Sequence, residues 1–151
     1  EGRALFYQPG ANYRDGNLDA VRTMLGHPQA VVGLADGGAH YGMICDASFP
    51  TSFLARWARD AAEADRIPLP QAVAALTSVP AQLAGLTDRG RLAPGAPADL
   101  LIFDVDTPWR VDEKKFRSKA KNSPYDGRRV QGHALRTVVA GETVFQRKRE
   151  S

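Results

Sequence analysis

The stretch AVVGLADGGAH, residues 30–40, is a short apolar run that ends abruptly in an aspartate and two glycines. Such a run, bounded by a glycine-rich polar turn, is typical of a strand buried on both faces of a parallel sheet. The preceding residues Leu18, Val21 and Leu25 have helical spacing, as in a repeating strand–helix unit. We therefore predict an α/β fold class, with a strand over about residues 30–36.

Asp36 lies just past the carboxyl end of this predicted strand. In α/β barrels the loops at this position converge on the active site. Gly37 and Gly38 let the backbone turn and leave space beside the carboxylate, which can ligate a metal ion or take a proton from metal-bound water. His40 can add a ligand or a hydrogen bond. The alternative is structural, because Asp-Gly is a common turn dipeptide and a loop histidine is usually solvated.

The rest of the chain changes character near residue 88. Before it, apolar spacing and well-placed prolines predict helices over about 51–66 and 70–79. After it, a strand is predicted over 98–104, a polar, loop-like segment over 106–134, and a hairpin over 135–145 whose turn contains Gly141. We therefore predict two domains, covering residues 1–88 and 89–151.

Composition limits the function classes. The chain has 151 residues, 43% of them hydrophobic, which is enough for a core, and its single cysteine excludes an internal disulfide. It contains no run of about 18 apolar residues and no signal peptide, so we predict a cytoplasmic protein. The net charge is +3, but the basic residues are not interleaved with stacking aromatics, so nucleic-acid binding ranks last among the hypotheses.

Several stretches resemble the amidohydrolase superfamily. Residues 33–50, GLADGGAHYGMICDASFP, resemble its strand-8 region and are most similar to the N-acyl-D-amino-acid deacylase (D-aminoacylase-like) branch. Residues 76–86 and 88–100 resemble its T-x-x-P-A helix and the following G-x-L-x-P-G-x-x-A-D-L pattern. Residues 121–127 and 137–145 resemble the C-terminal end shared with dihydroorotases and hydantoinases.

The resemblance implies that residues 1–88 are the last part of a (β/α)8 (TIM) barrel and residues 89–151 the C-terminal part of a small β-sandwich. Barrels of this superfamily hold one or two divalent ions, usually zinc. Their strand-8 aspartate contacts the metal and acts as general base, a role that maps here onto Asp36. The loop after strand eight borders the substrate pocket, and its candidate substrate-binding residues are His40, Tyr41, Cys45 and Ser48.

The chain departs from the superfamily pattern because it lacks an H-x-H pair and holds only three scattered histidines. A zinc hydrolase site needs about three protein ligands and an open position. The chain also begins at Glu1 in mid-pattern, which suggests a fragment. We therefore predict a parent enzyme that hydrolyses a C–N (amide) bond other than a peptide bond, and a chain that is inactive alone.

The parent's predicted reaction is N-acyl-D-amino acid deacylation by metal-activated water. The alternative is a non-catalytic fragment or partner-binding module that completes a fold. The expected partners are a small-molecule amide substrate and the remainder of the barrel or another chain, with no nucleic acid and no membrane.

Overall fold

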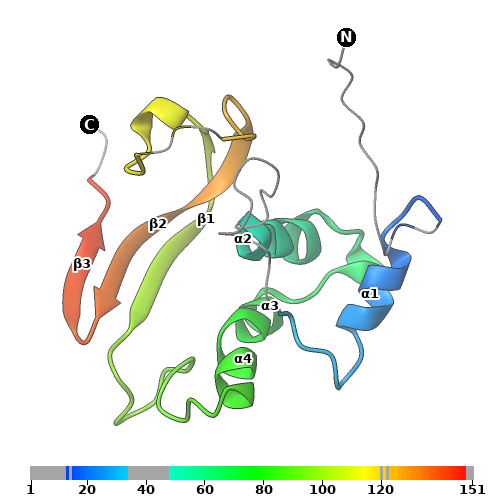
Figure 1. The fold of residues 1–151 in the computed structure, drawn as a ribbon, viewed down its shortest axis with the longest axis horizontal. Coiled ribbons are helices and arrows are strands. Elements are labelled where there is room, and N and C mark those ends of the chain that lie inside the picture. The colour runs from blue at the N-terminus through cyan, green and yellow to red at the C-terminus, as the bar shows by residue number, and fades with distance from the viewer. Residues whose placement is uncertain (1–12, 14, 34–47, 120, 122, 149–151) are drawn as a thin grey trace. The chain divides into compact units, whose positions relative to one another are not determined.

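The computed structural model describes residues 13, 15–33, 48–119, 121 and 123–148. The chain divides into two compact units, Glu1–Gly85 and Leu86–Ser151. The described part of the first unit is helical, and the second holds a three-stranded sheet (Figure 1). That these units are part of a barrel and part of a sandwich stays a prediction.

The first unit is a set of short helices around one hydrophobic cluster. In chain order they are α1 (Asp19–Leu25), α2 (Phe49–Phe53), the π-helix η2 (Leu54–Asp60), the 3-10 turn η3 (Glu63–Asp65), α3 (Leu69–Leu76) and α4 (Ser78–Leu83). The buried members of the cluster are Phe53, Trp57, Ala61 and Ala72. Apolar residues of α1, together with Val32, pack against them, so the predicted helical spacing before residue 26 is confirmed.

The structure differs from the predicted helix over 51–66. The helix begins at Phe49, becomes a π-helix and ends at Asp60, because Ala61 adopts an extended conformation with ψ 151°. The chain then turns back, and the Ile67 amide donates a hydrogen bond to the Trp57 carbonyl at 2.8 Å. This contact joins Ile67, which packs against the cluster, to the backbone of η2.

The predicted helix over 70–79 is divided into α3 and α4. The break lies at Thr77, whose hydroxyl donates to the Val73 carbonyl at 2.8 Å. Pro80 explains the break, because it has no N–H to donate to the Leu76 carbonyl and its ring would collide with that carbonyl. Helical structure then continues to Leu83, beyond the predicted end at residue 79.

The described part of the predicted strand over 30–36 forms no strand. Residues 30–33 carry no regular structure, and residues 34–36 lie outside the described residues. A buried parallel strand takes its hydrogen bonds from neighbouring strands. The described residues of the first unit include no other strand that could supply them.

The second unit is an antiparallel sheet in the order β1 (Leu100–Arg110), β2 (Arg129–Val139) and β3 (Glu142–Gln146), with the 3-10 turn η4 (Glu113–Lys115) between β1 and β2. The predicted hairpin over 135–145 is confirmed. Its two turn residues, Ala140 and Gly141, both have positive φ, as a type I′ turn requires. The predicted loop over 106–134 is too long, because β1 and β2 extend into it; polar residues occupy strands wherever a sheet faces water.

A bulge interrupts the pairing of β1 with β2. Asp104 lies opposite His133 and Pro108 lies opposite Gln131, so residues 105–107 face the single residue Gly132. Gly132 has φ 89°, and a Cβ there would lie 2.9 Å from the Asp104 carbonyl oxygen. Only glycine fits this position without a shift of the backbone.

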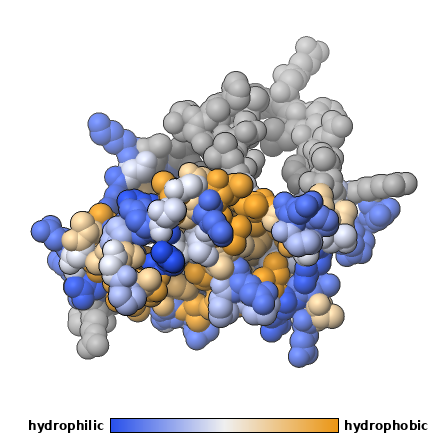
Figure 2. Space-filling view, turned by 90° about the horizontal axis from the view of Figure 1, so that it is seen from below, coloured by the Kyte–Doolittle hydropathy of each residue, from blue (hydrophilic) through white to orange (hydrophobic). Residues whose placement is uncertain are grey.

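The sheet leaves apolar side chains in water. Leu101 and Ile102 are successive residues, so they point to opposite faces, and they are 58% and 48% exposed. Hydrophobic residues are visible at the molecular surface in the space-filling view (Figure 2). The described helices include none that is long and apolar enough to cross a membrane.

Candidate functional site

Most of the predicted site residues fall in one segment that the structure does not describe. Asp36, His40, Tyr41 and Cys45 lie within 34–47, outside the described residues. Ser48 is described; it is half-buried and lies immediately before α2 as its N-cap residue. The proposed grouping of these five residues therefore stays a prediction.

The described residues on either side of this segment belong to the same core. Val32 precedes it and packs against the cluster, and Phe53 follows it and is a buried member of that cluster. The core that holds both flanks includes Trp57. A substitution in this core is therefore expected to alter the packing of both Val32 and Phe53, the described residues that flank residues 34–47.

Two arginines of η2 are held by local partners. Arg59 donates to Asp60 through Nε at 2.6 Å and Nη2 at 3.0 Å. The pKa of Arg59 is raised, chiefly by its hydrogen bond to Asp60, while slight burial acts in the opposite direction. The Arg56 guanidinium lies 5.3 Å from the Trp57 ring centre. Both cations are engaged with neighbours in their own helix, as expected for a solvated polar face rather than a clamp for a substrate carboxylate.

The described residues do not fit the divalent ion that the resemblance implies. Among them, no group of three or more His, Cys, Asp or Glu side chains could hold a metal. His27 accepts a hydrogen bond at Nδ1 from the Gln29 amide at 3.2 Å, and His133 stacks on Trp109 with ring centres 5.2 Å apart. Both described histidines therefore have structural partners.

Asp99, in the A-D-L part of the superfamily-like pattern, supports the fold. Its Oδ1 accepts a hydrogen bond from the Ala140 amide at 2.8 Å. Beside it, the Gly141 amide donates to the Ala98 carbonyl at 3.1 Å. These two bonds fasten the start of β1 to the β2–β3 turn, so this carboxylate has a structural role.

Asp104 is a residue that sequence reasoning missed. Its Oδ1 accepts from the amides of Asp106 at 2.6 Å and Thr107 at 3.0 Å, and its Oδ2 accepts from the Thr107 hydroxyl. These bonds hold the bulge described above. The signal was the string Asp104 to Pro108, since an aspartate shortly before a Thr-Pro pair is typical of a side-chain-capped turn.

Asp104 makes stability depend on pH. The Thr107 hydroxyl and the Asp106 and Thr107 amides lower the Asp104 pKa from 3.8 to about 2. A depressed carboxyl pKa stabilises the fold above the unfolded value, and this contribution is lost as pH falls from 3.8 toward 2.

We expect the urea midpoint of Asp104→Asn to change less with pH across this window than the midpoint of the wild-type chain. Asp106→Asn, whose carboxylate accepts none of these bonds, is expected to keep the wild-type dependence of the midpoint on pH. The same dependence in both variants would contradict this role.

Comparisons with known proteins cover most of the chain. The sequence model of the amidohydrolase family matches residues 2–145. A dihydroorotase of Lactobacillus johnsonii is 32% identical over 133 residues, which are 88% of this chain and 31% of that protein. A dihydroorotase of Anaplasma phagocytophilum is 54% identical over 71 residues, which are 47% of this chain and 16% of that protein.

A solved structure also matches. The L-hydantoinase (dihydropyrimidinase) from Arthrobacter aurescens is 40% identical, with a TM-score of 0.50, over 54% of this chain and 18% of that chain. The chain therefore spans less than a third of the length of these relatives.

Proposed function

Because the chain belongs to the amidohydrolase family, we propose that the protein containing it hydrolyses carbon–nitrogen bonds other than peptide bonds. The family match over residues 2–145 carries this proposal. The first-choice substrate class is a cyclic amide, such as dihydroorotate or a hydantoin. The names of the relatives support this class, and so do residues 121–127 and 137–145, which resemble the same enzymes.

The second candidate is deacylation of an N-acyl-D-amino acid. It rests on residues 33–50, whose sequence resembles the D-aminoacylase-like branch. The dihydroorotases and the L-hydantoinase named above carry a different activity in their names, so this candidate ranks below cyclic amides. Both reactions attack an amide carbonyl with water and differ in whether the amide lies in a ring.

Asp36 is the residue to which we assign the proton transfer. In this role its carboxylate takes a proton from the attacking water and returns it to the leaving nitrogen, as a general base and then a general acid. His40, Tyr41, Cys45 and Ser48 are proposed to line the substrate pocket. Any divalent ion, most simply zinc, would be held by residues outside the described part of the chain, because the described residues do not fit one.

The chain alone is proposed to be inactive and to need the remainder of the barrel as its partner. The exposure of Leu101 and Ile102 on opposite faces of β1 supports this, because large apolar side chains left in water favour association. The alternative, a non-catalytic module that completes a fold, shares this prediction of a partner. It differs in that the completed assembly would not hydrolyse amides.

The assay that separates these possibilities uses the full-length protein with added Zn²⁺. Dihydroorotate, a hydantoin and an N-acetyl-D-amino acid are each tested before and after treatment with a chelator. We expect hydrolysis of a cyclic amide that chelation abolishes, and no hydrolysis by residues 1–151 alone. Activity only on the N-acetyl-D-amino acid would favour the second candidate. A full-length, metal-loaded protein that cleaves none of them would contradict the enzyme proposal.

A further inference from the structure

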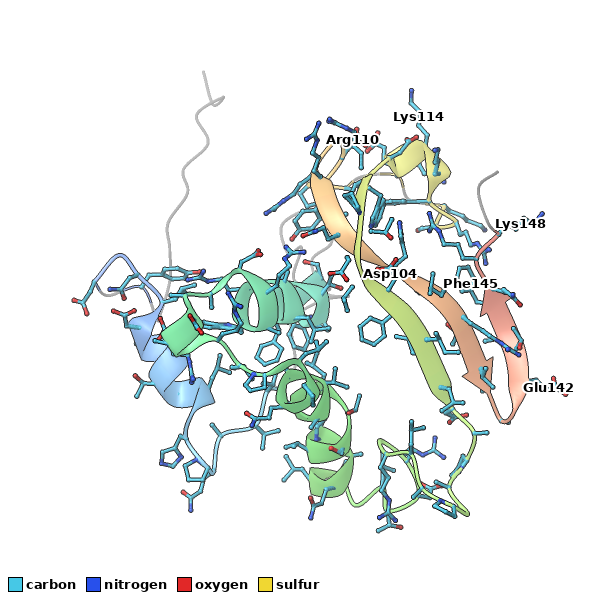
Figure 3. The ribbon with its side chains drawn as sticks, turned by 180° about the vertical axis from the view of Figure 1, so that it is seen from behind. Asp104, Arg110, Lys114, Glu142, Phe145 and Lys148 are labelled. Carbon is cyan, nitrogen blue, oxygen red and sulfur yellow. The ribbon has the colours of Figure 1, made fainter. Side chains whose placement is uncertain are left out.

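The sheet topology gathers positive charge at one end of the second unit. β1 ends there and β2 begins there, so Arg110 pairs with Arg129, whereas β3 ends opposite Arg136 and the chain then continues to Lys148. Arg110 and Lys114 lie at this end in Figure 3, and Glu142 lies at the opposite end. Residues 110–129 hold eight Lys and Arg against three Asp and Glu, and all eight cations are exposed. We call residues 110–129 together with Lys148 the basic end.

The carboxylates of the basic end offset only part of its positive charge. Asp112 accepts a hydrogen bond from the Lys114 amide, and Asp126 accepts one from the Glu113 amide, both at 3.0 Å. These acids therefore serve backbone turns. Within 110–129, the described residues form no ion pair with one another. The positive charge is left available to an outside partner.

Three arginines of the basic end are held in place. Arg110 donates through Nη1 to the Gly127 carbonyl at 2.7 Å. The Arg117 guanidinium lies 5.4 Å from the Phe145 ring centre, and that of Arg128 lies 5.7 Å from the Tyr125 ring centre. Cations fixed before binding lose less side-chain entropy when an anion arrives. The basic end thus differs from a set of free lysines on a solvated face.

We propose that the basic end binds the phosphate backbone of a nucleic acid without reading its sequence. An acidic protein is the less favoured partner, because protein interfaces have an apolar centre that is depleted in lysine. Here Val111 is only 7% exposed, and the aromatic rings are half-buried under arginines, so the surface presents mainly charge. Interfaces with nucleic acid are polar and strongly positive, as this end is.

This proposal reverses the expectation from the linear sequence and is independent of amide hydrolysis. The expectation treated the basic residues as not interleaved with stacking aromatics, but Phe116 and Tyr125 lie among them in the sequence. Linear spacing could not show that the far end of β3 joins residues 110–129. The fold brings Phe145 beneath Arg117 from 28 positions away along the chain, a separation that follows from their residue numbers.

The test compares two double variants of the full-length protein with equal loss of charge. Lys114→Gln with Lys115→Gln alters the basic end. Arg89→Gln with Arg91→Gln alters the loop that leads to the opposite end of the sheet. A fluorescent 20-base-pair DNA duplex of random sequence is titrated from 50 to 200 mM salt. We expect the basic-end variant to bind the duplex several-fold more weakly. The slope of log binding constant against log salt concentration should become smaller in magnitude by about one to two, since each lost phosphate contact removes roughly 0.9 from it.

The control variant is expected to keep the wild-type slope. Equal weakening in both variants, or no binding by the wild-type full-length protein, would overturn the proposal. The proposal would also be overturned if poly-glutamate displaced the labelled duplex as effectively as unlabelled DNA of equal charge does. That result would indicate an acidic protein partner. Far-UV circular dichroism of both variants checks that they fold alike.

Discussion

Replacing Asp36 by Asn in the full-length protein is expected to lower kcat on the order of 10²–10⁴-fold, the usual contribution of a general acid–base residue. Asparagine keeps the size of the side chain but cannot take a proton from the attacking water. We expect KM to change much less than kcat, because the loss falls on the transition state rather than on substrate binding. Steady-state kinetics on a cyclic amide, with metal content measured in the same samples, checks this result.

A matched control for this variant is Asp65→Asn. Asp65 is exposed in η3, and its backbone carbonyl, not its carboxylate, accepts the hydrogen bond from Arg22 Nε at 2.7 Å. This change should leave kcat and metal content unaltered. An unchanged rate in Asp36→Asn would remove Asp36 from the mechanism. A lost rate with lost metal, restored by excess Zn²⁺, would limit Asp36 to a metal contact.

The largest effect on stability is expected for Trp57→Ala. Trp57 is 6% exposed and packs in the cluster with Phe53, Ala61 and Ala72. Removing a buried indole leaves a cavity and typically costs about 3–5 kcal/mol of unfolding free energy. Because a small domain has only about 5–15 kcal/mol in total, this variant is expected to lose a large part of the stability of the first unit. Urea unfolding followed by far-UV circular dichroism measures the change.

Leu83→Ala serves as the comparison for Trp57→Ala. Leu83 ends α4 and is 73% exposed, so its truncation should change the unfolding free energy by no more than about 0.5 kcal/mol. If both variants lose similar stability, the cluster around Trp57 is not the core of this unit. If neither does, the first unit does not fold cooperatively in the chain by itself.

Local sequence signals predicted the structure where neighbours along the chain determine it. The β2–β3 hairpin is such a case, because Gly141 and the alternating strands on either side are sufficient to specify a tight turn. The α1 helix is another, since Leu18, Val21 and Leu25 have helical spacing and the Asn17 side chain accepts a hydrogen bond from the Asp19 amide at the start of the helix. Each of these features is stabilised by residues only a few positions apart.

Features that depend on distant contacts were predicted less well. The helix after Phe49 ends early because the Trp57 carbonyl takes its partner from Ile67, beyond the helix. The length of β1 depends on pairing with β2, which lies beyond the connecting residues 111–128, and the Asp104 bulge depends on Gly132. The candidate site has the same limitation. Asp36 was found by its position after an apolar run, but residues that would complete a metal site are not nearby in sequence.

The chain has two tryptophans, and one falls in each unit. Trp57 is buried among apolar side chains, whereas Trp109 is partly exposed, donates from Nε1 to the Gly132 carbonyl at 2.8 Å and stacks on His133. The two indoles should therefore emit at different wavelengths, with Trp57 nearer the blue. In a Trp109→Phe chain the remaining fluorescence reports on the helices, and in a Trp57→Phe chain it reports on the sheet. The fluorescence of the two single-tryptophan chains therefore shows which of the two units unfolds first.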